Sequence, residues 1–435
     1  MSGSGNVVRA VVGAVLRVVL AGCLLAVSAV VSGCGGGGGR TLVVLGPWTG
    51  GEEKPFLKVL DAVGERTGHR YVYQGTRSLR ETLVAQLQAG APPDVAVLNN
   101  LGDLVEYARD GAARPLPEGV AGSAVKPWAP RVQVTDGSGT TRENAYWVPV
   151  RIDLKSLVWS RSPPTTSPSL WCLGMASEAT SGWPGTDWIE DLLLQRRGAQ
   201  VYQDWATGRL AWSGPEVRGA WQEWADLLTP ESAADALSTS FEDIGGGRYG
   251  LLNRGTACAQ EHQGSFIRRH YGNEVLPYPT ALFVHGRAAR QTAFEVSGDM
   301  AAVFKESDDA WRLVRELTSE EARRDWVAAA RPQEQPLFPG GSIAGTRPPT
   351  PGTRTVQALL DGADRICFDA SDAMPPTLRD AFSRAVLEFL AAPHDSANLT
   401  RLLKQLDKES EFQHEDGAFQ LDDLCDRPHA GGAGG

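Results

Sequence analysis

Residues 41–111 read TLVVLGPWTGGEEKPFLKVLDAVGERTGHRYVYQGTRSLRETLVAQLQAGAPPDVAVLNNLGDLVEYARDG, and this stretch decides the fold. Short apolar segments bounded by turn residues predict three strands, at 41–45, 70–74 and 94–98. Apolar residues that recur at helical spacing predict three helices, at 52–67, 79–89 and 101–110. Strands that alternate with helices form parallel β–α–β units, so we expect an α/β fold with a doubly wound sheet.

The same alternation continues after a linker at 115–141 that is rich in Pro, Gly, Ser and Thr. The segment YWVPVRIDLKSLVW at 146–159 is strongly extended and is predicted to leave one sheet and enter another. Further helices are predicted at 183–197, 217–228, 309–330, 356–360, 378–391 and 399–406. The chain has 435 residues, enough for two domains of about 100–200 residues each.

Composition excludes two classes of protein. The chain contains 13 Trp, 8 Tyr and 12 Phe and is 42% hydrophobic, so it is not disordered throughout. A nucleic-acid-binding protein needs a basic face, which a formal net charge of −10 does not supply.

The first 34 residues are predicted to be an export signal. Their apolar run at 18–31 is shorter than the roughly 20 residues of a membrane-spanning helix. It ends in Val-Ser-Gly-Cys, which is similar to the bacterial lipobox, so Cys34 is the predicted lipidation site. A Gly-rich tether at 35–40 follows. We therefore expect an extracytoplasmic protein that is held at the cell membrane by its lipid anchor alone.

Several later segments resemble one protein family. They are PPDVAVLNN at 92–100, WCLGMASEATSGWPGTDWIEDLLL at 171–194, YQDWATGRLAWSGPEVRGAWQEWADLL at 202–228, CAQEHQGSFI at 258–267, FEVSGDMAAVF at 294–304 and FDASDAMPP at 368–376. With the lipobox and the tether, they resemble extracellular solute-binding proteins of bacterial ABC importers. The resemblance is to the alpha-glucoside and oligosaccharide type, which is related to maltose-binding proteins.

The resemblance implies a bilobal periplasmic-binding-protein-like fold, with two doubly wound sheets joined by a three-crossing hinge. The candidate crossings are 146–159, 276–284 and 365–374. The expected N-terminal lobe comprises 41–150 and 280–370, the C-terminal lobe comprises 151–279 and 371–428, and a disordered tail follows at 429–435. The implied function is capture of a sugar or oligosaccharide between the lobes and its presentation to permease subunits. The implied protein is a monomer that carries no cofactor.

One segment departs from the family pattern. Residues 161–170 form a Pro-rich bridge where the family has a helix-bearing region, which removes material near the cleft. A second interpretation therefore stays open. In it, the chain is a cell-envelope lipoprotein that has a structural, interaction or enzymatic role and kept the scaffold without transport.

Sugar binding calls for two kinds of side chain. Aromatic rings cover the apolar faces of sugars, and charged or amide groups bind the hydroxyls. In doubly wound sheets ligands bind beyond the carboxyl ends of the strands, and such residues gather there, in the crossover and in turns. The predicted ligand-binding residues are Trp48, Thr49, Glu52, Asn99, Arg151, Asp153, Lys155, Trp183, Asp187, Trp188, Ser297, Gly298 and Asp299.

Some of these residues also have purely structural interpretations. Trp188 lies next to a helix, where a core position is the commoner role, and Asp187 can cap the same helix. Trp48, at the end of the first strand, is the strongest ligand candidate. We expect Trp48 and Trp183 to approach opposite faces of the ligand, and Trp48 to contribute little to the core.

Enzyme motifs are incomplete in this chain. GGGRYG at 245–250 matches GxGxxG, but no strand precedes it, so we interpret it as a loop. GSIA at 341–344 lacks the last Gly of GxSxG. No cysteine or histidine spacing is typical of zinc. We therefore predict a protein that is not an enzyme, with no catalytic residues, metal or cofactor.

Four cysteines lie in the exported part: Cys172, Cys258, Cys367 and Cys425. Four cysteines in an exported protein predict two disulfides, for which three pairings exist, with free buried thiols as the alternative. The family resemblance implies the pairing Cys172–Cys258 and Cys367–Cys425.

Overall fold

The computed structural model describes residues 39–135, 137–255, 258–284, 293–341, 343, 346 and 348–427. The predicted export signal, the lipidation site Cys34, most of the tether and the tail at 429–435 lie outside the described residues. In the described part of the chain, no helix combines the length and the apolar character needed to cross a membrane.

The largest sheet contains the predicted first three strands, β1 (Thr41–Gly46), β2 (Arg70–Gly75) and β3 (Val95–Leu98). Its order is β14-β13-β12-β3-β1-β2, and β6 also pairs with β12. β1 runs parallel to both β2 and β3. The remaining strands of this sheet are β6 (Trp147–Leu154), β12 (Ala293–Val303), β13 (Arg365–Phe368) and β14 (Cys425–Asp426).

The predicted helices of residues 41–111 are confirmed as α2 (Lys54–Thr67), α3 (Leu79–Gln88) and α4 (Leu101–Arg109). α2 illustrates why they form. Pro55 stands in its first turn, where no backbone N–H is needed, and Gly68 ends it at a φ of 74°. Its buried face carries Phe56, Val59, Leu60 and Val63. Burial of each such side chain stabilises the fold by roughly 1.5–3 kcal/mol.

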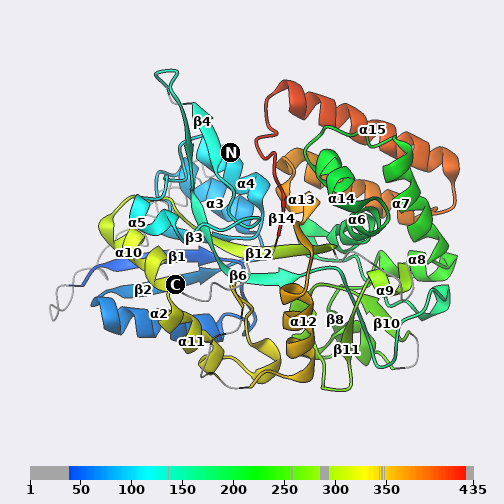
Figure 1. Cartoon of the computed structure of the whole chain (residues 1–435), viewed down its shortest axis with the longest axis horizontal. Helices are drawn as coiled ribbons and strands as arrows, with labels where there is room; N and C mark the ends of the chain where they lie inside the picture. Colours follow the sequence, from blue (N-terminus) through cyan, green and yellow to red (C-terminus); the bar gives the residue numbers. More distant parts are fainter. Residues whose placement is uncertain are drawn as a thin grey trace, which may run out of the picture. The chain divides into compact units, whose positions relative to one another are not determined.

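One group of elements, which we call the first lobe, packs around β1, β2 and β3 and is drawn in part in blue and cyan in Figure 1. Besides α2, α3 and α4 it includes α10 (Asp308–Leu317) and α11 (Glu320–Ala329), because both contact α2. Near it lie α5 (Glu118–Ala121), which contacts α10, and the hairpin β4 (Val132–Thr135) and β5 (Thr141–Asn144), of which β4 contacts α4. A single helix was predicted at 309–330, but the Ser319 side chain caps a second helix there by accepting the N–H of Ala322.

The second lobe is built on a sheet of order β10-β7-β11 and on α6. Its main elements are β7 (Leu157–Ser160), α6 (Trp183–Ala206), α7 (Pro215–Asp226), α8 (Pro230–Ala236), β10 (Gln260–His262), β11 (Leu276–Pro279), α9 (Ala281–Val284), α12 (Pro351–Asp361), α13 (Ala370–Ala373), α14 (Pro376–Leu390) and α15 (Ser396–Glu415). The shorter elements are β8 (Asp243–Gly245), β9 (Arg248–Tyr249), η1 (Pro168–Leu170), η2 (Glu178–Thr180), η3 (Leu251–Asn253), η4 (Ser265–His270) and η6 (Pro332–Glu334).

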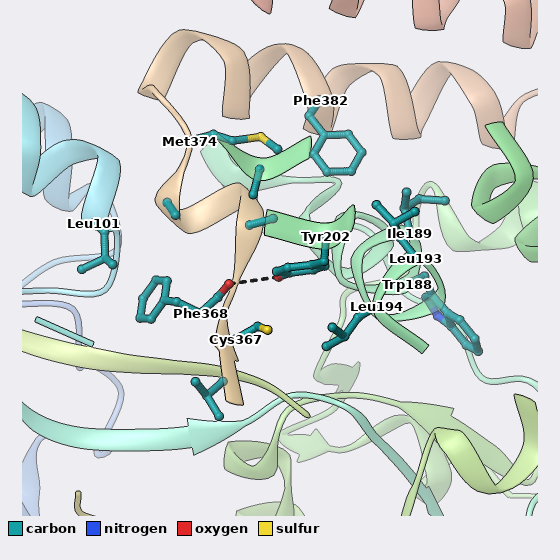
Figure 2. Close-up of a cluster of buried hydrophobic side chains, with 14 of the residues drawn as sticks. Leu101, Trp188, Ile189, Leu193, Leu194, Tyr202, Cys367, Phe368, Met374 and Phe382 are labelled. Carbon is teal, nitrogen blue, oxygen red and sulfur yellow. Dashed lines mark hydrogen bonds between the residues drawn. The ribbon is translucent and has the colours of Figure 1, made fainter. Parts of the chain in front are cut away.

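The core of the second lobe gathers on α6. Figure 2 shows Trp188, Ile189, Leu193 and Leu194 of this helix among other buried side chains. The Tyr202 hydroxyl of α6 donates to the backbone oxygen of Phe368 at 3.0 Å, which joins the helix to β13. Burial of this hydroxyl is therefore accompanied by a hydrogen bond, as the polar end of a buried tyrosine requires.

β6 and β12 run antiparallel through the middle of the fold and join the two lobes (Figure 1). One half of β12, at Met300–Val303, pairs with β3, and the other half, at Ala293–Val296, pairs with β13. β6 therefore confirms the first predicted crossing, and β12 is the second. The chain crosses again between α11, which packs on α2, and α12, which packs on β11.

Two predicted crossings and one sheet differ from expectation. The stretch at 276–284 forms β11 and α9, which pair with β7 and contact α6, and 365–374 forms β13 and α13, which also contact α6. Both stretches therefore stay with the second lobe. The second sheet is antiparallel rather than doubly wound, because β7 pairs with β10 and β11 in that sense. The predicted lobe boundaries remain a proposal, and α9 and α12 within 280–370 contact the second lobe.

Both disulfides of the predicted pairing are present. Cys172 is bonded to Cys258, and Cys367 is bonded to Cys425, with sequence separations of 86 and 58 residues. The second bond lies between β13 and β14, where the two cysteines face each other in the strand register. It fastens the C-terminal segment to the sheet.

Candidate ligand-binding site

The hinge strands place one ion pair at the junction of the lobes. Arg151 of β6 stands opposite Asp299 of β12 in the register, and its Nε lies 2.7 Å from an oxygen of Asp299. Burial, opposed by Arg151, raises the pKa of Asp299 to about 6. Burial opposes the charge of Arg151 too, but the carboxylates of Asp299, Asp153 and Glu52 raise its pKa. The two strands thus bring together two predicted site residues.

Glu52, in the loop between β1 and α2, extends this pair across the lobes. One of its oxygens lies 2.6 Å from Nη1 of Arg269 in η4 and 3.6 Å from Nη2 of Arg151. Its other oxygen lies 3.6 Å from Nη2 of Arg77, which follows β2. Arginine side chains of both lobes therefore contact this carboxylate. Its side chain is 14% exposed, so these contacts are only partly screened by solvent.

Glu242 completes what we call the Glu52 cluster, which consists of Glu52, Arg77, Arg151, Glu242, Arg269 and His270. An oxygen of Glu242 lies 2.5 Å from Nη2 of Arg269 and 3.0 Å from Nε2 of His270. Burial alone would raise the pKa of Glu242, but the hydrogen bonds and charges of His270 and Arg269 outweigh it and lower the pKa to about 2. Glu242 is therefore ionised at neutral pH.

A second group of charges, the Lys155 cluster, is fully buried in the second lobe. It consists of Lys155, Asp187, Glu190, Glu295 and Asp369. The Lys155 ammonium lies 2.6 Å from an oxygen of Asp187 and 3.1 Å from an oxygen of Asp369. Burial, opposed by Lys155, raises the pKa of Asp187 to about 6. Burial together with the neighbouring carboxylates raises the pKa of Glu190 and Glu295 well above the usual range.

Three carboxylates of the Lys155 cluster lie as close together as the ligands of a metal ion. Oxygens of Asp187, Glu295 and Asp369 lie within 4.8 Å of one another. Carboxylate oxygens suit magnesium or calcium. The Lys155 ammonium already contacts two of the three carboxylates, so it supplies the positive charge that a metal ion would otherwise bring.

Trp183 stands at the edge of this buried group. Its half-buried ring lies 4.9 Å below the Lys155 ammonium and packs edge-on against Phe241 at 5.0 Å between ring centroids. Phe266 lies 6.0 Å away. Phe241 directly precedes Glu242 in the chain, so the indole packs against the sequence neighbour of a residue in the Glu52 cluster. Trp183 thus belongs to a small aromatic group with Phe241 and Phe266.

The structure corrects the prediction that Trp48 contributes little to the core. Its side chain is 2% exposed and packs against Phe56, Tyr73 and Trp326, with ring centroids 4.7, 6.2 and 5.4 Å away. The Arg151 guanidinium lies 5.0 Å from its ring centroid. The expectation that Trp48 contributes little to the core is therefore wrong, because the strand end turns its indole inwards under α2 and α11.

The structure gives Trp188 the structural role considered from sequence, but not Asp187. Trp188 is 2% exposed and stacks on His262 with 4.5 Å between ring centroids, so it belongs to the core rather than to a ligand site. Asp187 does not cap α6, because the cap position is Gly182 and the Asp187 carboxylate pairs with Lys155 instead. Asp187 is therefore a buried ion-pair partner of Lys155, and its role in ligand binding stays a prediction.

The other predicted residues lie along the hinge strands or at loop ends. Asp153 is buried and accepts a hydrogen bond of 2.5 Å from the Ser265 hydroxyl. The Ser297 carbonyl accepts the Trp128 indole N–H at 2.9 Å. Gly298 lies so close to β6 that a Cβ atom there would stand 2.8 Å from the Arg151 carbonyl. These residues brace the hinge.

Two loop residues complete the predicted set. The Thr49 carbonyl accepts the Glu52 N–H at 3.2 Å and so shapes the loop that carries Glu52. Asn99 is exposed, and its side-chain oxygen accepts a hydrogen bond from the side-chain amide of Asn100. The side-chain oxygen of Asn100 in turn accepts from Arg379 of α14 at 2.6 Å. Arg379 also lies 3.3 Å from Asp103 of α4, which gives a second ionic contact between the lobes.

Sequence reasoning missed six residues of the two clusters that come from both lobes and from the hinge strand β12, namely Arg77, Glu242, Arg269, His270, Glu295 and Asp369. A weak signal existed, because Asp369 and Glu295 lie inside two of the segments that carry the family resemblance and Arg269 follows a third.

The Pro-rich bridge at 161–170 is held by hydrogen bonds to other segments of the second lobe. The Thr165 N–H donates to Gln260 of β10 at 2.8 Å, and the Arg161 side chain donates to the Leu252 carbonyl at 3.1 Å.

The two-lobed fold with hinge strands between the lobes is the fold of bilobal periplasmic solute-binding proteins. Comparison with known proteins agrees, and the chain resembles the carbohydrate-type solute-binding proteins of ABC importers. No protein-family model matches the chain. It is similar to the alpha-glucosides-binding periplasmic protein AglE of Rhizobium meliloti (strain 1021), with 28% identity over 392 residues, which cover 81% of this chain and 84% of the relative.

A second curated relative is the osmoprotective compounds-binding protein GgtB of Synechocystis sp. It is 26% identical over 377 residues, which cover 77% of this chain and 85% of the relative. Among solved structures, the bacterial solute receptor AcbH, described as preferring β-D-galactopyranose, matches with a TM-score of 0.64 at 12% identity. That match covers 86% of this chain and 99% of AcbH, and it shows the fold. By their names these three proteins bind solutes.

Proposed function

We propose that the chain is the solute-binding component of an ABC importer and that it captures a sugar or oligosaccharide between its two lobes. The observation that carries the proposal is the Glu52 cluster, in which Glu52 of the first lobe meets Arg269 of the second at 2.6 Å beside a half-buried Trp183. Charged groups of this kind bind hydroxyls strongly, and an indole covers the apolar face of a sugar ring. The name of one curated relative, an alpha-glucosides-binding protein, supports the same ligand class.

The mechanism is closure of the lobes about the hinge strands. A ligand that contacts both lobes gains part of its interactions only when they approach, so it shifts the population towards the closed form. The pair of Arg151 and Asp299 lies on the hinge strands themselves and keeps its register while the lobes move about them. Sugar hydroxyls then take over hydrogen bonds that Glu52 and Arg269 make to each other.

The proposed setting is the outer face of the cell membrane. Lipidation of Cys34 would hold the chain there as a monomer, and the closed form would dock on permease subunits. The periplasmic location in the name of one curated relative supports an extracytoplasmic site. The prediction for the anchor is that Cys34→Ala releases the protein from membranes, because the tether has no apolar segment that replaces acyl chains. Recovery of the variant in the membrane fraction would contradict the anchor.

The test of ligand class is a thermal-shift screen of the purified protein against glucose, galactose, maltose, maltotriose and raffinose. A ligand present at 100 times its Kd stabilises the folded state by about 2.7 kcal/mol, which raises the melting temperature measurably. Trp183→Ala is expected to lower the melting temperature of the free protein by only a few degrees and to lose the shift. A chain that no sugar stabilises, or a Trp183→Ala variant with an unchanged shift, would refute the proposal.

A further inference from the structure

The glycine run at 245–250 forms the tip of a hairpin that presents one aromatic side chain. β8 and β9 pair across Gly245, Gly246 and Gly247, whose φ angles are 86°, 65° and 73°. Three successive left-handed residues are possible here because glycine has no Cβ. The turn is short, and Arg248 and Tyr249 follow it at once. The sequence motif therefore serves to position Tyr249.

Tyr249 is unusual because it is both exposed and fixed. In the described part of the chain the exposed large hydrophobic side chains are Tyr249, which is 46% exposed, and Phe412, which is 62% exposed. The Tyr249 ring stacks on His270 with 5.3 Å between centroids and 17° between planes. The Asn253 amide donates to the carbonyls of both Tyr249 and His270, at 2.9 and 3.1 Å. One amide thus holds the backbones of both stacked residues, and the ring needs little ordering before it binds.

The stacked pair borders the Glu52 cluster. Nε2 of His270 lies 3.0 Å from Glu242, and Arg269, the neighbour of His270 in η4, bridges Glu242 and Glu52. Tyr249 therefore stands one residue outside the charged groups that meet across the lobes. An isolated exposed aromatic needs no explanation, but a rigid one beside charged hydrogen-bonding groups has the composition of a sugar subsite.

We propose that Tyr249 is a stacking platform for a sugar unit that projects from the interlobe site, so that the chain prefers oligosaccharides to shorter sugars. The inference rests on the proposed function. The inner unit of the ligand contacts the Glu52 cluster and Trp183. The next units pass Arg269 and His270, and one lays its apolar face on the exposed part of the Tyr249 ring, as sugars do on aromatic side chains.

The experiment compares Tyr249→Ala with Tyr249→Phe and with Phe412→Ala, the matched loss of an exposed aromatic on α15, by calorimetric titration of the purified protein with maltose and maltotetraose. We expect Tyr249→Ala to weaken maltotetraose binding by about three- to tenfold and to change maltose binding by less than about twofold. Tyr249→Phe keeps the ring, and Phe412→Ala removes an unrelated one, so both are expected to bind maltotetraose like the unmodified protein.

The possible outcomes separate the two proposals. If the unmodified protein binds both sugars and Tyr249→Ala weakens them equally or not at all, the platform is refuted while sugar binding stands. If maltotetraose binds no more tightly than maltose, the platform is also refuted. If the unmodified protein binds neither sugar, the alpha-glucoside ligand fails, and the platform fails with it. A circular-dichroism melting curve shows whether Tyr249→Ala retains the fold. Tyr249→Phe, which keeps the ring and loses only the hydroxyl, shows whether the ring itself is what binding needs.

Discussion

Each lobe holds a cation over a tryptophan, and the two pairs differ in what surrounds them. Arg151 lies 5.0 Å from the ring centroid of Trp48, and Lys155 lies 4.9 Å from that of Trp183. Trp48 is a core residue that is 2% exposed, whereas Trp183 is half-buried. The same pair of residue types therefore braces the hinge in one lobe and borders the candidate ligand site in the other. Burial, not residue type, separates the two roles.

The charges around the two cations differ as well. Counted with Asp299, the partner of Arg151, the Glu52 cluster has three arginines for three acids, and the pKa of Glu242 falls to about 2. In the Lys155 cluster several buried carboxylates share one ammonium, and the pKa of Asp187 rises to about 6. Balanced charge permits opening and closing with modest changes in free energy. Unbalanced buried charge makes the second lobe depend on its lysine.

The largest expected effect comes from removing that lysine. Lys155→Met leaves Asp187 and Asp369 buried without their counter-charge, so we expect a loss of about 3–5 kcal/mol in the free energy of unfolding at neutral pH. Urea denaturation measures it. The control is Lys126→Met, because Lys126 pairs with Asp423 at 2.7 Å on the surface, and its loss should cost less than about 1 kcal/mol. Equal losses in the two variants would remove the contrast between buried and exposed pairs.

The two tryptophans are expected to differ nearly as much. Trp48→Ala opens a cavity beside Phe56 and Trp326 and should cost about 3–5 kcal/mol in unfolding free energy. Trp183→Ala should cost about 1 kcal/mol, because its ring is half-buried. Chemical denaturation of both variants under one set of conditions gives the comparison. A Trp48→Ala variant as stable as the unmodified protein would restore the original interpretation of Trp48 as a cleft residue.

The stabilisation that Asp187 of the Lys155 cluster contributes is expected to fall as the pH rises. The pKa of Asp187 is raised from 3.8 to about 6, because burial outweighs the attraction of Lys155. The folded chain therefore holds a proton that the unfolded chain has released. This stabilisation is fully present below pH 3.8 and is lost as the pH rises through about 6. Asp187→Asn should flatten that slope by up to about 1.4 kcal/mol for each pH unit.

Glu242 provides the control of opposite sign. Its pKa is lowered from 4.5 to about 2, so its stabilisation is present above pH 4.5 and is lost as the pH falls through about 2. Glu242→Gln should therefore leave the slope above about pH 5 unchanged. Urea midpoints measured at several pH values test both variants. A flattened slope in Glu242→Gln, or an unchanged one in Asp187→Asn, would mean that other groups carry the titration.

The smallest expected effect on stability comes from Arg269. Arg269→Gln removes the contacts of 2.6 Å with Glu52 and 2.5 Å with Glu242, but Glu52 keeps Arg77 and Arg151 and Glu242 keeps His270, so the unfolding free energy should change by about 1 kcal/mol. Its larger effect is on the spacing of the lobes, so we expect a greater radius of gyration by small-angle scattering. Arg196→Gln, which breaks a pair with Glu223 inside the second lobe, should leave the radius unchanged. Identical radii for both variants would show that the contact does not hold the lobes together.

Much of the fold could be predicted from local sequence. The apolar segments of residues 41–111 fall on β1, β2 and β3, and the helical spacing falls on α2, α3 and α4. The bilobal class and both disulfides followed from the family resemblance, and the comparisons and the structure agree with them. The break between α10 and α11 was missed, because a serine cap leaves the apolar spacing of the two helices almost continuous.

About half of the candidate site could also be found. The sequence predicted Glu52, Arg151, Lys155, Asp187, Trp183 and Asp299 as polar or aromatic residues near strand ends and turns. The structure places the first four in the two clusters, and Trp183 and Asp299 contact Lys155 and Arg151. Their partners Arg269, Glu242, Asp369 and Glu295 were not predicted. Each lies far from its partner along the chain, as Glu52 does from Arg269, and nothing in its local pattern distinguishes it from a surface charge.

The sequence by itself thus determined the elements, the export signal it predicts and the types of residue near the hinge, because periodicity, turn residues and apolar runs act over a few neighbours. Only the tertiary structure decided which charges meet, which tryptophan is buried and which face of the hairpin at Tyr249 is exposed. These outcomes depend on the antiparallel register of β6 and β12 and on the packing of α11 over Trp48. A shift of one residue in that register would turn Arg151 away from Asp299, so the site exists only in the folded chain.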